Sequence, residues 1–344
     1  MNNIDQGYLD LLNDIINNGH KKGDRTGTGT ISVFGRQIRH DMSLGFPLLT
    51  TKRIPFNLIK SELKWFLKGS TDIRDLWKDN NHIWDGDWYK KYKSSTSSPY
   101  SLDEMIKSGL EDTPNYFHKS IWSLGPIYGK QWRNWEIYNN DYNGPPYKDI
   151  DQIQKVMDDL QNNPDSRRIM VNAWNVGELN QMTLPPCHYG FQFWTRELSE
   201  GERFTYYKNI HSKESQKMFN LLTFDHSYFD EVGVPKRTVS LMWNQRSVDT
   251  PLGLPFNIAS YALLLEMMAS EINMVAVELI GNLGDVHIYN NQINGVLNQL
   301  ERGIGNLPQI KIADGMYSSL DPTSKDVILE NYNPQSKIPI IKLK

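Results

Sequence analysis

Cysteine is almost absent from this chain. Of its 344 residues, only Cys187 is a cysteine. One cysteine cannot form an internal disulfide, and it is too few for a metal site built from thiolates. The sequence therefore predicts neither a disulfide framework nor a bound metal. A lone thiol is also typical of a reducing compartment such as the cytoplasm.

Long apolar runs and a strong charge imbalance are lacking too. No apolar run approaches the roughly 18 residues that a membrane-spanning helix needs. Residues 1–5 lack the basic and apolar regions of a signal peptide. The net charge of -3 provides no electrostatic footprint for nucleic acid or for an anionic membrane. These absences predict a cytoplasmic protein with a small-molecule partner, no membrane and no required nucleic acid.

The one cysteine lies in a distinctive local sequence, LPPCH at residues 184–188. Two prolines restrict the backbone before Cys187, and residues 189–194 have the composition of a strand. A thiol at the mouth of a strand, with His188 beside it, becomes a nucleophile if nearby cations lower its pKa. The alternative interpretation is a small buried apolar residue, which is the common role of a lone cysteine.

Hydrophobic patterning predicts a mixture of helices and strands. Helical periodicity occurs around residues 8–16, 59–67, 153–160, 258–268 and 293–300, and strand-like runs around 31–34, 169–174, 189–194, 238–246 and 275–280. Two polar stretches, at about 90–120 and 197–237, are predicted insertions, the first helical around 102–106 and the second flanked by strands like a hairpin. The order predicts an α+β fold, a single domain over residues 1–344 around a large mixed β-sheet with flanking helices.

Several polar or aromatic positions are candidates for a site, each with a plainer alternative. The glycine-rich run at 24–30 contains Arg25 and suits an anion, but it also suits a flexible turn. Arg167 and Arg168 at a strand start suit a phosphate, or a solvated surface. Glu62 borders an apolar helical stripe, where a carboxylate is either paired or functional. The aromatic run 83–89 suits a platform for a flat ring, or core.

These motifs together resemble the thymidylate synthase family, over nearly the whole chain outside the two insertions. The matching segments are DRTGTGT (24–30), FPLLTTK (46–52), DSRR (165–168), PCH (186–188), QRS (245–247) and LPFNIASYA (254–262). The resemblance implies a homodimer formed by sheet-to-sheet packing. It also implies methylation of dUMP to dTMP with 5,10-methylenetetrahydrofolate, which supplies the carbon and the hydride and leaves as dihydrofolate.

The resemblance also implies a role for each matched residue. Cys187 is the nucleophile, and Glu62, Tyr128, His188, Asp249 and Arg246 complete the catalytic set. The arginines around the phosphate are expected to favour the Cys187 thiolate. The substrate-binding residues are Arg25, Gln245, Arg246, Ser247, Asn257, His287 and Tyr289, with Arg167 and Arg168 from the other subunit. The folate-binding residues are Ile83, Trp84, Leu184, Asp249, Leu252, Gly253 and Phe256. Asn257 has the plainer alternative of a helix N-cap.

The sequence departs from the family pattern at a few places. Trp88 lies one residue further from Trp84 than the second tryptophan usual in the family. Asn244 stands where the family usually has an aromatic residue, and Pro251 is unusual in its loop. The last residue is the charged Lys344, where the family usually has a small apolar residue. A related enzyme, dUMP hydroxymethylase, shares the early chemistry and adds water where thymidylate synthase adds hydride. It is the alternative function, and a non-catalytic nucleotide- or RNA-binding regulator is the remote one. The retained cysteine, glutamate and arginines argue against the regulator. The retained Trp84, PCH segment and Gly253 loop favour hydride transfer, and therefore thymidylate synthase over the hydroxymethylase.

Overall fold

A six-stranded mixed β-sheet forms the centre of the computed structural model, which describes residues 2–24, 27–111, 119–138, 147–210, 225–312 and 327–339. Its strands run in the order β1-β2-β8-β7-β6-β5, and every pair is antiparallel except β7 with β8. The predicted α+β fold around a large mixed sheet is confirmed. The strands are β1 (His20–Lys22), β2 (Thr30–Asp41), β5 (Met170–Asn172), β6 (His188–Glu197), β7 (Arg237–Asp249) and β8 (Val275–Tyr289).

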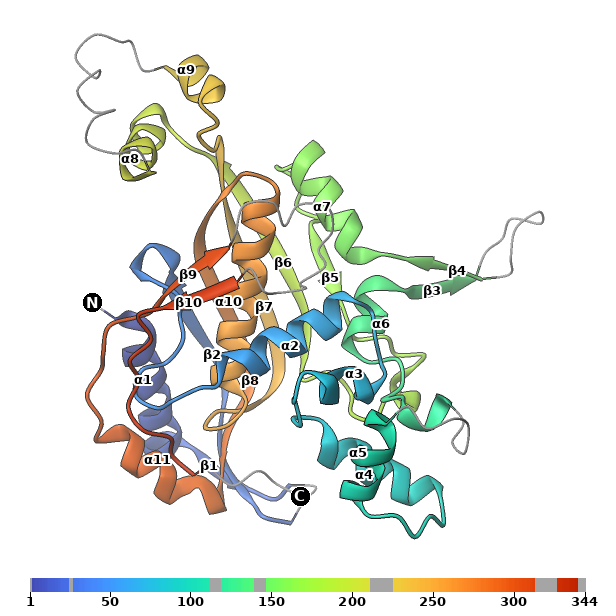
Figure 1. The fold of residues 1–344 in the computed structure, drawn as a ribbon. Coiled ribbons are helices and arrows are strands. Elements are labelled where there is room, and N and C mark those ends of the chain that lie inside the picture. Colours follow the sequence, from blue (N-terminus) through green and yellow to red (C-terminus); the bar gives the residue numbers. More distant parts are fainter. Residues whose placement is uncertain are drawn as a thin grey trace.

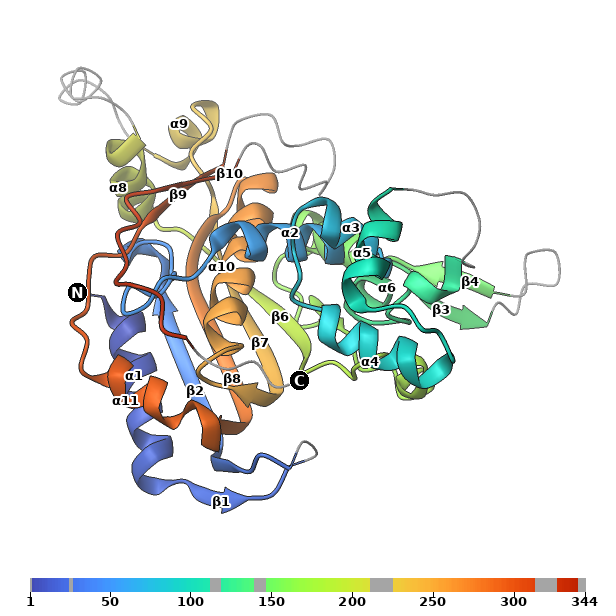
Figure 2. The same cartoon turned by 60° about the horizontal axis from the view of Figure 1, so that its bottom comes forward.

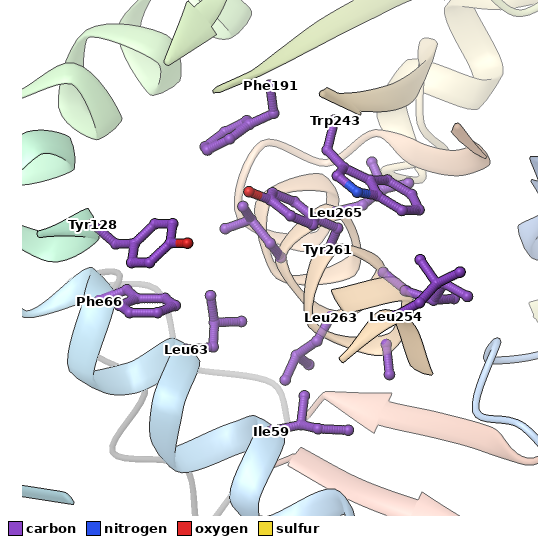
Figure 3. Close-up of a cluster of buried hydrophobic side chains, with 14 of the residues drawn as sticks. Ile59, Leu63, Phe66, Tyr128, Phe191, Trp243, Leu254, Tyr261, Leu263 and Leu265 are labelled. Atoms are coloured by element: carbon purple, nitrogen blue, oxygen red, sulfur yellow. The ribbon is translucent and has the colours of Figure 1, made fainter. Parts of the chain in front are cut away.

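One face of the sheet is covered by helices (Figure 1). Contacts join α10 to β7 and β8, α2 to α10, and α1 to β2 and α11. Helix α10 is apolar almost all round because it is buried between the sheet and α2. Figure 3 shows Ile59 and Leu63 of α2 beside Leu263 of α10 in this core. These helices are α1 (Asn3–Asn18), α2 (Phe56–Leu67), α10 (Leu254–Glu271) and α11 (Ile293–Leu300).

A second group of helices lies beside the sheet (Figure 2). Several tryptophans pack against one another in its core. Trp88 is only 1% exposed and stacks on Trp122, with ring centroids 5.6 Å apart, and on Tyr92 at 5.5 Å. The helix predicted near residues 102–106 is confirmed as α5, which a Ser101–Glu104 capping box begins. The elements here are α3 (Ile73–Lys78), α4 (Asp85–Ser95), α5 (Leu102–Leu110), α6 (Tyr128–Arg133), α7 (Gln152–Asn162), β3 (Trp135–Tyr138) and β4 (Tyr147–Ile150).

Between β6 and β7 the chain forms a helical pair, α8 (Glu200–Ile210) and α9 (His226–Glu231), that projects from one end of the sheet (Figures 1 and 2). The two strands pair antiparallel, so the predicted hairpin-like arrangement is confirmed. Arg203 is buried, and its guanidinium donates to Asp230 at 2.7 Å and to the Val234 carbonyl at 2.8 Å. The pair therefore has polar ties and a small core of its own, built on Tyr207, Phe229 and Val234.

Some element boundaries differ from the prediction. The strand predicted at 275–280 continues to Tyr289 because it is central, with β2 on one side and β7 on the other. Gly281 permits this, since a Cβ there would lie 2.3 Å from the Trp243 ring. Helix α10 begins at Leu254 with Gly253 as its N-cap, so Asn257 lies inside the first turn and is not a cap.

The remaining elements are two short strands and several 3-10 helices. The strands β9 (Gln309–Ile312) and β10 (Val327–Glu330) form a separate two-stranded antiparallel sheet. The 3-10 helices are η1 (Met42–Leu44), η2 (Lys119–Trp122), η3 (Leu179–Gln181) and η5 (Asn290–Gln292). Within the described ranges, no helix combines the length and the apolar character needed to cross a membrane.

Candidate active site

Cys187 immediately precedes β6, and its main chain is fixed on both sides. Its backbone N–H donates to the Tyr128 hydroxyl at 2.8 Å, and its carbonyl accepts from the Arg246 N–H at 2.8 Å. A register irregularity between His188 and Gly190 lies directly after it. This irregularity lets both His188 and Phe191 contact the helix side of the sheet, where His188 stacks on Tyr128 with ring centroids 4.2 Å apart.

The thiol faces a cavity of about 490 Å³ between α2, α4, β7 and the start of α10. This volume suits a small-molecule site. The cavity brings together fourteen of the residues expected at a site: Glu62, Ile83, Trp84, Tyr128, Leu184, Cys187, His188, Gln245, Ser247, Asp249, Leu252, Gly253, Phe256 and Asn257. Segments separated by nearly 200 residues thus meet at one thiol.

The groups around the thiol shift its pKa in opposite directions. Burial raises the pKa of Cys187, the Arg246 guanidinium lowers it, and the carboxylates of Asp87 and Asp249 raise it. The expectation that arginine favours the thiolate therefore has the correct sign for Arg246. Burial nevertheless outweighs it in the single chain, because desolvation disfavours the charged form. A further arginine near the thiol would lower its pKa.

The Arg246 guanidinium is held in place by three contacts. It donates to the carbonyls of Pro186 and Pro185, each at 3.0 Å, and lies over the Trp174 ring at 5.2 Å. The two prolines before the cysteine thus orient an arginine as well as the thiol. This charge is restrained before any anion arrives.

Gln245 and Asn257 form a hydrogen-bonded pair in the cavity wall. The Gln245 side chain donates to the Asn257 side-chain oxygen at 3.1 Å and to the Ser247 carbonyl at 3.1 Å. Because the Asn257 oxygen accepts this bond, its orientation is set, and its amide NH2 group and a remaining lone pair are available to a ligand.

The cavity also contains two carboxylates with defined partners, Glu62 and Asp249. Trp84 donates its indole N–H to Glu62 at 2.8 Å. Asp249 accepts from the Leu252 N–H at 3.1 Å and from Gln292 at 3.2 Å, and burial raises the pKa of this carboxyl. Lys52 donates to the Pro251 carbonyl, and burial lowers the pKa of its ammonium to about 7.

The other candidates lie outside the cavity wall. His287 and Tyr289 are near the end of β8, with their rings 5.1 Å apart, and His287 lies beside Asp249 in the sheet register. Arg167 and Arg168 are exposed in the turn before β5. Arg25 lies outside the described residues, as does Lys344.

Four residues that line the cavity were not predicted from the sequence. Asp87 lines the cavity three residues after Trp84, whereas Trp88 points into the tryptophan core and donates to the Ile121 carbonyl at 2.8 Å. The position of Asp87 could have been predicted from the sequence, because residues three apart lie on the same face of a helix. Leu58, Asn80 and His82 also line the cavity without having been expected. Across the part of the chain that is described, no group of three or more His, Cys, Asp or Glu could hold a metal ion.

A thiol held against a cavity with carboxylates, a histidine and an oriented amide is the arrangement expected of an enzyme that acts by covalent attack on a small substrate. Comparison with known proteins specifies it further. The family model for thymidylate synthase matches residues 6–342. The thymidylate synthases of three Listeria monocytogenes strains (serotype 4b CLIP80459, serotype 4b F2365 and serotype 4a HCC23) are each 36% identical over 353 residues, covering 96% of this chain and 97% of theirs. The chain belongs to the thymidylate synthase family and is a methyltransferase of nucleotide biosynthesis.

Proposed function

We propose that the protein methylates dUMP to dTMP with 5,10-methylenetetrahydrofolate, and that Cys187 begins the reaction by adding to C6 of the uracil. The observation that carries this proposal is the position of the Cys187 thiol in a cavity that also holds Glu62, Tyr128, His188 and Asn257. Uracil C5 is too weak a nucleophile alone. Thiolate addition at C6 converts the ring into an enolate whose C5 attacks the one-carbon unit.

The chain's own residues have distinct tasks in this proposal. Asn257, oriented by Gln245, donates to uracil O4 and accepts from N3–H. Glu62, held by the Trp84 indole, organises the water that removes the C5 proton. The thiolate leaves C6 when the ring regains its double bond. When bound, the folate supplies the one-carbon unit and then a hydride, and becomes dihydrofolate.

The folate site in this proposal is the wall formed by Ile83, Trp84, Leu184, Leu252 and Phe256, with Asp249 and Gly253. A flat apolar ring fits this lining, and the buried Asp249 carboxylate can accept from ring N–H groups.

The dUMP phosphate is assigned to Arg246 and Ser247, with Arg25, and to Arg167 and Arg168 of a second copy of the chain. The ribose hydroxyl is assigned to His287 and Tyr289. The sheet's uncovered side supports a homodimer, because Phe34 is 83% exposed, Trp194 60% and Met170 54%. A groove of about 500 Å³ crosses this side, and Arg246 lines it together with Met170 and Trp174. Such an apolar sheet face suits sheet-to-sheet packing.

The domain organisation proposed from the sequence is kept: a single catalytic domain over residues 1–344 with insertions at about 90–120 and 197–237. Support comes from the separate small core of the α8–α9 pair. The cytoplasmic location stays a prediction.

Incubation of the protein with dUMP and methylenetetrahydrofolate tests the proposal. We expect dTMP by mass and dihydrofolate by absorbance, in equal amounts. Cys187→Ala should retain the fold but form no covalent complex with 5-fluoro-dUMP and the folate. A surviving covalent adduct in that variant would contradict the assignment of the nucleophile.

A second candidate function is dUMP hydroxymethylase. The observation that favours it is Asp87, which places a carboxylate in the cavity wall where an indole was expected. Hydroxymethyl-dUMP as the main product, with tetrahydrofolate left unoxidised, would establish this alternative.

A further inference from the structure

Behind His188, on the side away from the cavity, lies the buried phenol of Tyr261. The Tyr261 hydroxyl and Nδ1 of His188 are 2.8 Å apart, and the two rings meet edge to face with centroids 5.4 Å apart. Tyr261 is only 2% exposed and does not line the cavity. Its ring stacks on Trp243 at 5.4 Å and contacts Phe191 at 5.5 Å. Figure 3 shows the hydroxyls of Tyr261 and Tyr128 pointing toward one another.

The protonation states of this pair are defined by burial. Burial lowers the pKa of His188 to about 3, so the imidazole is neutral at physiological pH. Burial also raises the pKa of Tyr261 well above its ordinary value, so the phenol keeps its proton. A neutral imidazole has one N–H and one bare nitrogen, and the hydrogen bond at one nitrogen decides which is which.

The direction of the hydrogen bond follows from the surroundings of the phenol. Its ring lies among Trp243, Phe191 and His188, and among the described residues the one hydrogen-bond partner within reach of its hydroxyl is Nδ1 of His188. A buried O–H without an acceptor is costly, so the hydroxyl donates to Nδ1. The proton of the imidazole is then on Nε2, which has no protein partner in the described part of the chain, and His188 lines the cavity.

We propose that Tyr261 is a positioning residue that holds His188 as the Nε2–H tautomer, so that the imidazole presents a donor to the oxygen of the uracil enolate formed at Cys187. This inference rests on the proposed function for the identity of the acceptor. The tautomer itself does not depend on it. A neutral donor stabilises developing negative charge on oxygen without transferring its proton.

The tautomer can be measured directly on the intact protein. With ¹⁵N-labelled histidine, and with His188 identified by its absence in His188→Gln, we expect a bare Nδ1 and a protonated Nε2 without any substrate. Tyr261→Phe keeps the ring contacts with Trp243 and Phe191 and should give a mixture of the two tautomers. A protonated Nδ1 in the wild type would overturn the proposal even if the variant failed to fold.

Kinetics supply a second, independent readout. Tyr261→Phe should lower kcat roughly tenfold and change KM for dUMP less than about twofold, because the donor acts on charge that develops during reaction. The matched control is Tyr207→Phe, which removes a buried phenol hydroxyl bonded to Tyr228 at 3.2 Å in the α8–α9 pair. That control should leave both constants unchanged.

A double-mutant cycle separates positioning from general loosening. In a His188→Gln background, the side-chain amide supplies an N–H near the Nε2 position and has no tautomers, so adding Tyr261→Phe should lower kcat less than about twofold. An equal loss in both backgrounds would contradict the proposal. Absence of any dTMP from the wild type would instead count against the proposed function and leave the tautomer result standing.

Discussion

Tyr128→Phe removes the one hydrogen bond that the backbone N–H of Cys187 makes to a side chain in the described structure. The Tyr128 hydroxyl accepts that bond at 2.8 Å, and the phenol is only 2% exposed. Phenylalanine keeps the stacking on His188 at 4.2 Å and the contact with Phe66 at 4.8 Å. The change therefore isolates the hydroxyl from the packing of the ring.

The magnitude follows from the group left behind. A buried N–H without an acceptor costs about 1–3 kcal/mol. If that cost appears as displacement of the thiol from its reactive position, kcat should fall roughly 5- to 150-fold. Burial raises the pKa of Tyr128 well above its ordinary value, so its loss removes no ionisation from the physiological range. The shape of the pH profile should be preserved while its height falls.

The assay compares kcat with the rate of covalent adduct formation by 5-fluoro-dUMP. We expect both to fall by the same factor, since both require attack by Cys187. Tyr207→Phe is again the matched control and should retain both rates. A Tyr128→Phe enzyme with normal kcat and normal adduct formation would refute the reasoning that this hydroxyl positions the nucleophile.

Three further outcomes are expected. A mixture of Arg168→Ala and Cys187→Ala chains should regain activity, because some dimers then contain one intact site; dimers confirmed by sedimentation without recovery would argue against shared sites. Asp87→Asn removes a carboxylate that raises the pKa of Cys187, so the acid limb of kcat/KM should move to lower pH, and an unmoved limb would show that the charge does not act there. Asn257→Asp should shift preference from dUMP toward dCMP, because a protonated carboxyl can donate to the bare N3 of cytosine and accept from its amino group; wild-type enzyme binding both nucleotides equally would disprove the base assignment.

Local sequence patterns predicted α1, α2, α5, α7, α10 and α11, because an apolar stripe or run is read from neighbouring residues, but they did not predict α3, α4, α6, α8 and α9. The stripe of Ile59, Leu63 and Phe66 is α2, and that of Ile153 and Val156 is α7. The far end of β8 was missed because its identity as a strand depends on two partners. Its glycines are unfavourable in an isolated strand, but here the Trp243 ring lies against Gly281 and the Arg246 backbone lies against Gly284.

The residues of the candidate site were predicted from their resemblance to family motifs and not from local sequence patterns. Cys187, Glu62 and Asn257 are far apart in the chain, and only family resemblance indicated that they meet. Their hydrogen bonds could not be predicted, because each depends on tertiary contacts. The bond from Gln245 that orients Asn257 joins a strand to a helix, and the one from Trp84 to Glu62 joins the start of α4 to the middle of α2.

Trp88 of α4 is one residue further along the chain than the second tryptophan usual in the family, and this difference places Asp87 in the cavity wall. Trp88 cannot move into the wall without leaving the Ile121 carbonyl unpaired and breaking its stacking on Trp122 and Tyr92. Asp87 therefore occupies a position where an indole would exclude water, and a carboxylate instead holds water. Hydride transfer to the uracil methylene competes with addition of water at the same carbon. Trp84 remains in the wall, where its indole N–H donates to Glu62, so we expect the balance between methyl and hydroxymethyl products to depend on the two neighbouring side chains Trp84 and Asp87.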